Sequence, residues 1–276
     1  MSAEAAPQTV SRRANAAHFD MLLRSWSRMT PPMRPNQEVA AAVAHQISGY
    51  EARALLLGVT PEYAGLADNL VALDISPAMV GAIWPGDTGA RRALVGDWLH
   101  APFASGSFSC CIGDGSVSVL RYPDEVALLF AEVARLMRPG GKVASRVFAR
   151  PARAETATRF RDDALAGRIT NFYAFKWRLA MLLASEDNAY NVALRLVLDE
   201  FNRLFPDRDR LAQAAGWSRA LIDEMDLYKG SPTVFSFATC ERLAATAATS
   251  FVNIRFVPSG SYELAERCPL LVMERA

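Results

Sequence analysis

The sequence predicts a doubly wound α/β fold: a mostly parallel sheet of seven strands with an antiparallel last strand, and a helical insertion. Three observations support this prediction. Short apolar runs recur between helix-like segments, as in parallel strands buried on both faces. Residues 151–238 interrupt this alternation with helical patterns. Two final apolar runs are joined by a short linker, which favours an antiparallel hairpin.

The first 50 residues are expected to form a helical arm. A helix over 36–50 should begin at Asn36, a good N-cap residue, and stop at Gly49. A short helix over 16–26 and a proline-rich turn over 29–37 precede it. The arm is a candidate to fold over a ligand, with Trp26 or Arg34 reaching it; the alternative is a surface arm.

Apolar runs predict the strands that follow the arm. The expected parallel strands are 52–58, 70–76, 91–98, 108–115 and 142–149. A helix over 123–141 should cover them, because Val126, Leu129, Val133 and Leu136 share one face. A helix over 239–249 and the last two strands, 251–260 and 268–275, complete the sheet.

These elements divide the chain into three parts. Residues 1–50 form the arm, residues 51–150 and 239–276 form one ligand-binding α/β domain, and residues 151–238 form a cap over the carboxyl ends of its strands. Aromatic residues in the cap alternate with Arg168, Lys176 and Arg178. This pattern fits core packing or a pocket for a planar or acidic compound.

The composition excludes several classes of protein. Apolar residues make up 51% of the 276 residues and charged residues 21%, which permits a large core. The net charge of +1 does not indicate a nucleic-acid or membrane partner. The local excess of arginine over 150–178 permits RNA binding, although a solvated face is favoured. The sequence has neither a signal-peptide pattern nor a membrane-spanning run, so we expect a cytoplasmic protein.

Cysteine and histidine do not form a metal-binding pattern. The four cysteines include no C-x-x-C pair, and the three histidines lie far apart in the sequence. We therefore expect buried thiols in a reducing compartment and no metal site.

Polar residues end four of the predicted strands: Thr60, Asp74, Asp97 and Asp114. Because the carboxyl ends of parallel strands share one edge of the sheet, these side chains should lie near one ligand. The first turn, LGVTPE, lacks both the G-x-G-x-x-G and the P-loop patterns, and Glu62 would repel a phosphate. A nucleoside with a cationic tail fits this turn better than a dinucleotide does.

S-adenosylmethionine (SAM) has such a tail, with a sulfonium and an ammonium group and no phosphate. Gly58 would let it approach the backbone, Thr60 would cap the next helix, and Pro61 suits that helix's first position. Backbone N–H groups at the start of that helix would hold the ligand's carboxylate. Asp74 is placed to accept from the ribose hydroxyls, and Asp97 from the adenine amino group beside Trp98.

On these stretches the chain resembles the class I SAM-dependent methyltransferases of EC class 2.1.1. The matching segments are LLLGVTPE, a variant first motif, and VALDIS, VGDWLHAPFASGSFSCCIGDG and EVARLMRPGGKV. The family's usual acidic residue on the first strand is absent here, and Glu62 can stand in for it. The residues expected at the cofactor are Gly58, Thr60, Pro61, Glu62, Asp74, Ile75, Met79, Gly96, Asp97, Trp98, Asp114 and Gly115.

The resemblance implies SAM as cofactor and S-adenosylhomocysteine as product. The length of the cap, residues 151–238, argues for a small-molecule acceptor enclosed under it. The sequence singles out no catalytic residue; the candidate bases are His18, Asp114, Tyr122 and Tyr173. Two alternatives remain open, a SAM-binding module without transferase activity and, less favoured, an RNA methyltransferase. An NAD(P) oxidoreductase is disfavoured by the glycine pattern and Glu62.

Overall fold

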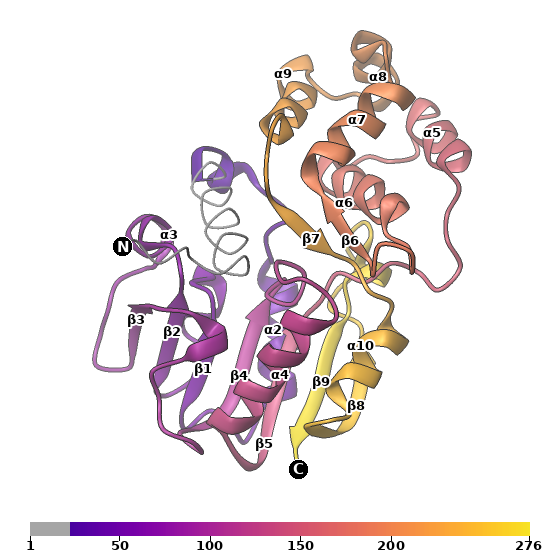
Figure 1. The fold of residues 1–276 in the computed structure, drawn as a ribbon. Helices are drawn as coiled ribbons and strands as arrows, with labels where there is room; N and C mark the ends of the chain where they lie inside the picture. The colour runs from indigo at the N-terminus through magenta and orange to yellow at the C-terminus, as the bar shows by residue number, and fades with distance from the viewer. Residues whose placement is uncertain (1–22) are drawn as a thin grey trace, which may run out of the picture.

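A computed structural model describes residues 23–276 of the chain. Its main feature is a seven-stranded sheet with the order β3-β2-β1-β4-β5-β9-β8 (Figure 1). Strands β1 to β5 are parallel, and β9 is antiparallel to both of its neighbours, as the sequence predicts. The strands are β1 Ala54–Leu57, β2 Leu70–Asp74, β3 Arg91–Val95, β4 Phe108–Asp114, β5 Met137–Arg146, β8 Phe251–Val257 and β9 Leu270–Arg275.

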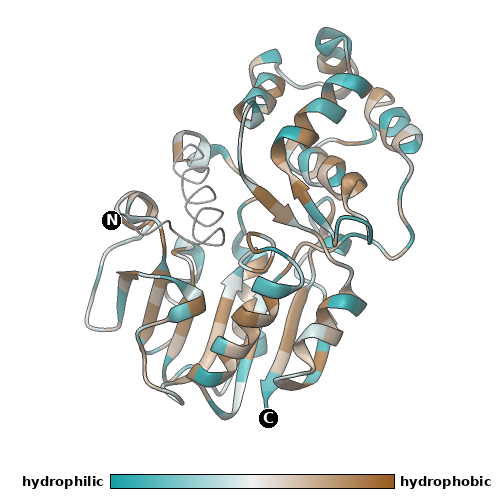
Figure 2. Ribbon diagram, viewed as in Figure 1, coloured by the Kyte–Doolittle hydropathy of each residue, from teal (hydrophilic) through white to brown (hydrophobic). Residues whose placement is uncertain are grey.

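Strand residues alternate between two apolar cores, one on each face of the sheet. Ala54 and Leu56 of β1 belong to the core beneath helix α2 (Gln37–Ile47), whereas Leu55 and Leu57 belong to the core beneath α4 (Asp124–Leu136). Because both faces are covered, every residue of β1 is buried. This double burial explains the continuous apolar runs in the sequence, and Figure 2 shows the apolar colour concentrated on the strands.

Helices α2 and α4 begin within one residue of the position that the sequence predicts. The Asn36 side chain accepts a hydrogen bond from the Val39 N–H at 3.0 Å, which caps α2. The apolar face expected for α4 is buried, including Leu129 and Val133. The remaining helices of the sheet domain are α3 Pro77–Ile83 and α10 Cys240–Ala247.

Three connections differ from the sequence prediction. The segment after β1 forms only a short 3-10 helix, η2 (Pro61–Tyr63), in place of the expected helix, because proline fixes its start and small and polar residues follow. The predicted helix over 16–26 falls partly outside the described residues, and η1 (Leu23–Arg28) is a 3-10 helix. Strand β5 begins at Met137, before the Pro-Gly-Gly turn, because Met137 already pairs with Phe108.

The insertion between β5 and α10 is helical, with one addition. Strands β6 (Asn191–Ala193) and β7 (Val234–Ser236) form a separate antiparallel pair that the sequence analysis missed. Three-residue strands are too short to show the period-two pattern on which such predictions rely. The helices are α5 Ala157–Leu165, α6 Phe172–Leu183, α7 Leu194–Leu204, α8 Arg208–Ala215, α9 Arg219–Asp223 and the 3-10 helix η4 Glu224–Tyr228.

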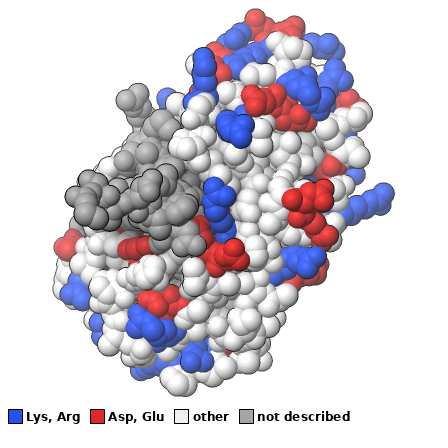
Figure 3. Space-filling view, in the orientation of Figure 1, with Lys and Arg blue, Asp and Glu red and all other residues white. Residues whose placement is uncertain are grey.

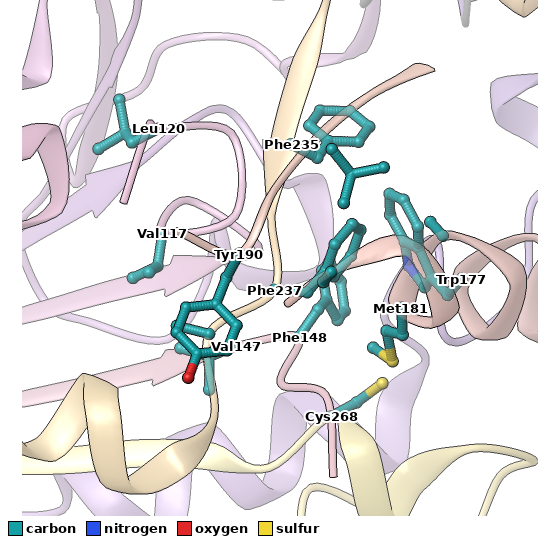
Figure 4. Packing of buried hydrophobic residues seen from close by; sticks show 14 of the residues in the cluster. Val117, Leu120, Val147, Phe148, Trp177, Met181, Tyr190, Phe235, Phe237 and Cys268 are labelled. Atoms are coloured by element: carbon teal, nitrogen blue, oxygen red, sulfur yellow. The ribbon is translucent and has the colours of Figure 1, made fainter. Parts of the chain in front are cut away.

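An apolar junction fixes the insertion above the carboxyl ends of the parallel strands (Figure 1). The Phe148 ring, just after β5, lies 5.2 Å from the Trp177 ring of α6, and Trp177 lies 5.4 Å from Phe237. Figure 4 shows these rings packed together with Phe235, whose ring lies 5.4 Å from that of Trp177. The insertion and the sheet therefore share one continuous core.

Candidate functional site

A pocket lies at the carboxyl edge of the sheet, beside the adjacent strands β1, β2 and β4. Most of the residues predicted from the sequence line it. They are Gly58, Thr60, Asp74, Ile75, Met79, Asp97, Trp98, Asp114 and Gly115. Pro61, Glu62 and Gly96 are not among the lining residues, although Pro61 follows Thr60 and Gly96 precedes Asp97, which both line the pocket.

Of the other lining residues, the sequence analysis named only Trp26, as a residue by which the arm would reach the ligand. Trp26 and Met33 come from the arm, so the arm does reach this pocket. Ser116, Val119 and Leu120 come from the loop that follows β4. The sequence signal for this loop was its position directly after the strand that ends in Asp114, where parallel sheets place their ligands.

Gly58, Asp74 and Trp98 converge on one point of the pocket wall. A Cβ added at Gly58 would lie 3.8 Å from both Asp74 Oδ2 and Trp98 Cζ2, so a side chain there would enter this space. Gly58 has φ +99°, which favours glycine. The Trp98 Nε1–H donates to the Leu73 carbonyl, and the Ser76 N–H donates to Asp74 Oδ1 at 2.8 Å. These bonds hold the indole and the carboxylate in place.

Asp97 caps the short turn that carries Trp98. Its Oδ1 accepts from the Leu99 N–H at 3.0 Å, and its Oδ2 lies 3.5 Å from His100 Nδ1. Gly96 has a packing role instead, because a Cβ there would lie 2.7 Å from Leu73 Cδ1. Gly96 therefore supports the strand end rather than the pocket lining.

Thr60 is the N-cap of η2, but its side chain makes no capping hydrogen bond, contrary to the expectation. The helix it was expected to cap is a single three-residue turn. That turn is too short to present a set of aligned N–H groups to a carboxylate. The suggested binding of a ligand carboxylate by a helix start at this turn therefore has no structural support.

Asp114 is engaged by a buried arginine that the sequence analysis did not assign to the site. Arg146, at the end of β5, is fully buried and donates Nε and Nη2 to the two carboxylate oxygens at 2.5 and 2.9 Å. It also donates to the Pro32 carbonyl at 2.9 Å and the Tyr262 hydroxyl at 3.0 Å. Burial alone lowers the pKa of Arg146, but Asp114 outweighs it and raises the pKa above its usual value. Asp114 therefore shapes the wall as part of an ion pair and is not a candidate base.

Glu62 connects the first turn to the arm. Its Oε1 accepts from Arg34 Nε at 2.6 Å, and the Arg34 guanidinium lies over the Trp26 ring at 5.2 Å. Within residues 23–276, Glu62 Oε2 and the adjacent Tyr63 hydroxyl are buried without a hydrogen-bond partner. Buried unsatisfied polar atoms next to a pocket are typical of a site that holds a ligand.

Gly115 provides the first test of this geometry. We expect Gly115→Ala to lower the free energy of unfolding by about 1–3 kcal/mol, because the residue has φ +67° and its Cβ would lie 2.7 Å from Phe148 Cε2. Gly89→Ala is the control, since nothing lies within 4 Å of its Cβ position. Urea unfolding measures both, and equal midpoints for the two variants would contradict the predicted clash.

Three of the six arginines over 150–178 are engaged within the protein, whereas Arg153, Arg159 and Arg161 are exposed. Arg178 pairs with Glu155 and Asp163, Arg168 pairs with Asp163, and Arg150 donates to the Ala184 carbonyl. Burial raises the pKa of Glu155, but the hydrogen bond and charge of Arg178 outweigh it and lower the pKa. Figure 3 shows acidic and basic residues interspersed over the visible face of the insertion. These ion pairs weaken the argument for an RNA-binding surface.

The other candidate bases from the sequence are Tyr122, Tyr173 and His18. Tyr122 lies outside the pocket lining, and its hydroxyl donates to the Arg242 carbonyl at 3.3 Å. Burial raises the pKa of Tyr173, which lies near Glu224 of the insertion. His18 lies outside the described residues. In residues 23–276, no cluster of His, Cys, Asp and Glu has the composition of a metal site, and no helix is both long and apolar enough to cross a membrane.

Sequence comparisons identify relatives for part of the chain. Residues 56–145 match the family model described as "Methyltransferase domain". Over 169 residues the chain is 33% identical to demethylmenaquinone methyltransferase from Mycobacterium sp. (strain KMS), a match that covers 58% of this chain and 63% of the relative. The match therefore spans less than two thirds of that curated relative's length.

Solved structures with similar folds have low sequence identity. A 1,6-didemethyltoxoflavin-N1-methyltransferase from Burkholderia thailandensis has a TM-score of 0.55 and 13% identity, covering 100% of this chain and 93% of that one. A Rhodobacter sphaeroides structure described as a putative Zn-dependent alcohol dehydrogenase has a TM-score of 0.58 and 11% identity, covering 95% and 98%. At these identities the similarity concerns the fold alone. Residues 56–145 thus match a methyltransferase-domain model, and they lie in a sheet that has the Rossmann-like methyltransferase fold.

Proposed function

We propose that this protein transfers a methyl group from SAM to a small-molecule acceptor held between the sheet and the insertion, which acts as a cap. The observation that carries the proposal is the convergence of Asp74, Asp97 and Gly58 on one pocket at the carboxyl edge of the sheet, where Asp114 also lies but is paired with Arg146. A pocket with acidic strand ends and no phosphate-binding loop suits a cationic nucleoside. The methyltransferase domain match over 56–145 supports the same reaction class.

The residues around the pocket fit the parts of this cofactor. Asp74 would accept from the ribose hydroxyls, and Asp97 would accept from the adenine amino group. Ile75, Met79 and Trp98 also line the pocket, and their side chains would provide apolar surface for the adenine ring. At the other end, the unsatisfied Oε2 of Glu62 offers a buried acceptor for an ammonium group. The lining loop at Gly115 and Ser116 would then face the methyl group.

SAM supplies a methyl group on a positively charged sulfur, so the protein's task is to align and enclose the reacting groups. Trp26 and Met33 of the arm would close the pocket from one side, and Val119 and Leu120 from another. These apolar side chains exclude water from the position of the methyl group. The protein's contacts with SAM and the acceptor thus serve to align the reacting groups, and no proton transfer by a side chain is needed.

A small-molecule acceptor is favoured by two observations. The insertion packs closely on the sheet through Phe148 and Trp177, in the same core as Leu120, which lines the pocket. By their names, demethylmenaquinone methyltransferase and the toxoflavin enzyme act on small molecules.

We expect Asp74→Ala to weaken SAM binding by about 1–3 kcal/mol, because charge-assisted hydrogen bonds to the ribose would be lost. Isothermal titration calorimetry measures this change. Asp68→Ala is the matched control, since Asp68 is an exposed carboxylate before the other end of β2. An affinity unchanged by Asp74→Ala would remove Asp74 from the proposed site.

The same calorimetry tests the ligand class. The wild-type protein should bind SAM and S-adenosylhomocysteine and show no heat with NAD. Binding of NAD in preference to SAM would overturn the proposal in favour of an oxidoreductase. A SAM affinity that is lowered by neither Asp74→Ala nor Asp97→Ala would place the ligand elsewhere.

A further inference from the structure

A buried lysine lies in the insertion without an anionic partner among the described residues. The chain has three lysines: Lys142, Lys176 and Lys229. Lys142 pairs with Glu274 at 2.7 Å, and Lys229 is exposed. Lys176, on α6, is 2% exposed, and within residues 23–276 no carboxylate lies at ion-pair distance from its Nζ. A buried cation without a counter-ion is costly, so its presence calls for an explanation.

Aromatic rings surround this ammonium group. Lys176 Nζ lies 4.8 Å from the centre of the Tyr228 ring and 5.7 Å from that of Phe172. Such cation–π contacts replace only part of the lost hydration. Burial lowers the pKa of Lys176 to about 8, and the charge of Glu224 opposes this shift. The cage thus stabilises the cation incompletely.

The charged and titratable groups facing this cage come from three elements. Glu224 and Tyr228 belong to η4, Tyr173 belongs to α6, and Arg28 belongs to η1 of the arm. Glu224 is engaged by the arm, since it accepts from Ser25 Oγ at 3.4 Å and from Arg28 Nη2 at 3.1 Å. The Glu224 carboxylate therefore pairs with Arg28 and is not available as a counter-ion for Lys176 alone.

The arm connects this cage to the cofactor pocket. Ser25 contacts Glu224 in the insertion, and the next residue, Trp26, lines the pocket. The contacts that close the cage on the arm side are weak, because the Ser25 bond is long and the Arg28 side chain is 68% exposed. The second half of the arm is held firmly by the bond between Pro32 and the buried Arg146. A compound that reaches the cage from this side would displace the contacts of Ser25 and Arg28 of η1 with Glu224.

We propose that Lys176 binds an ionised oxygen of the methyl acceptor, and that the acceptor is an aromatic compound with an acidic hydroxyl group. This inference rests on the methyl transfer proposed above. The ammonium group supplies the charge that an aromatic oxyanion needs, and the rings of Phe172 and Tyr228 suit a planar molecule. The oxyanion in turn supplies the counter-ion that Lys176 lacks.

The chemistry balances without a further reactant. The acceptor hydroxyl releases its proton to solvent on binding, and Lys176 remains protonated. The electron-rich anion then forms a bond to the methyl carbon, while the carbon–sulfur bond breaks and its electron pair stays on sulfur. The negative charge of the acceptor and the positive charge of the sulfonium cancel in this step. Lys176 raises the population of the reactive anion.

The test uses 4-nitrophenol, whose phenolate form absorbs visible light and whose phenol form does not. Wild-type protein saturated with S-adenosylhomocysteine should produce the phenolate band at a pH at which the free probe is mostly protonated. Lys176→Met should weaken phenolate binding roughly 10- to 100-fold, as expected for a lost charge-assisted hydrogen bond. Lys229→Met is the matched control, because it removes an exposed lysine next to Tyr228.

Two further measurements make the result decisive. 4-Nitroanisole, the uncharged methyl ether, should not compete with the probe. Calorimetry with S-adenosylhomocysteine should give equal affinities in wild type, Lys176→Met and a second variant, Lys176→Gln. No phenolate band in wild type, a band that survives in both Lys176 variants, or equal binding of the anisole would overturn the assignment of Lys176. Failure of S-adenosylhomocysteine to bind wild type would instead overturn the proposed function.

Discussion

Replacing Arg146 with Met is expected to lower the free energy of unfolding by about 3–5 kcal/mol, because the buried Asp114 carboxylate would lose its ion-pair partner. The side chains of Arg146 and Asp114 are 0% and 7% exposed, so solvent screens this pair weakly. The variant also loses the bond to the Pro32 carbonyl, which ties the arm to the sheet. Urea unfolding measures the stability, and calorimetry with SAM should show weaker binding.

Two comparisons separate loss of the pair from loss of a side chain. Arg203→Met removes an exposed arginine that pairs with Glu200 on one helix face, and it should change stability little. In the double variant Arg146→Met with Asp114→Asn, the uncompensated charge is gone, so part of the stability should return. A loss in Arg146→Met no larger than that in Arg203→Met, or a double variant no more stable than Arg146→Met, would contradict this account.

Replacing Lys176 with Met is expected to stabilise the protein below pH 8 by about 1–3 kcal/mol. The folded-state pKa of Lys176, about 8, lies below its ordinary value of 10.5, so the unfolded chain binds the proton more tightly. The protonated form therefore destabilises the folded state fully below pH 8, and this penalty fades as pH rises from about 8 to 10.5. Methionine removes the penalty, at the cost of the contacts with Phe172 and Tyr228.

The measurement is the difference in unfolding free energy between Lys176→Met and wild type, followed from pH 7 to 10.5. The difference should shrink over this range, since only wild type gains stability from the deprotonation of Lys176. Lys229→Met, at an exposed position, should show a constant difference. A difference for Lys176→Met that is independent of pH would show that the buried group does not titrate as inferred.

Much of the sheet could be predicted from local patterns. The runs at β1, β2 and β4 are apolar throughout because both of their faces are covered, and α4 shows its buried face at helical spacing. Asn36 marked the start of α2 for a local reason, since an N-cap bonds within its own first turn. The three-residue strands β6 and β7 could not be predicted from local patterns, because each is short and is stabilised by a partner distant in sequence.

The candidate site divides in the same way. The sequence by itself determined which strand ends carry polar groups, since Asp74, Asp97 and Asp114 each follow an apolar run and parallel strands end at one edge. Only the tertiary structure decided what these groups contact. Arg146 pairs with Asp114 across β4 and β5, and the arm reaches Glu62 and the insertion from a distant part of the chain. Such contacts depend on how separate elements pack in space, and no spacing along the chain encodes them.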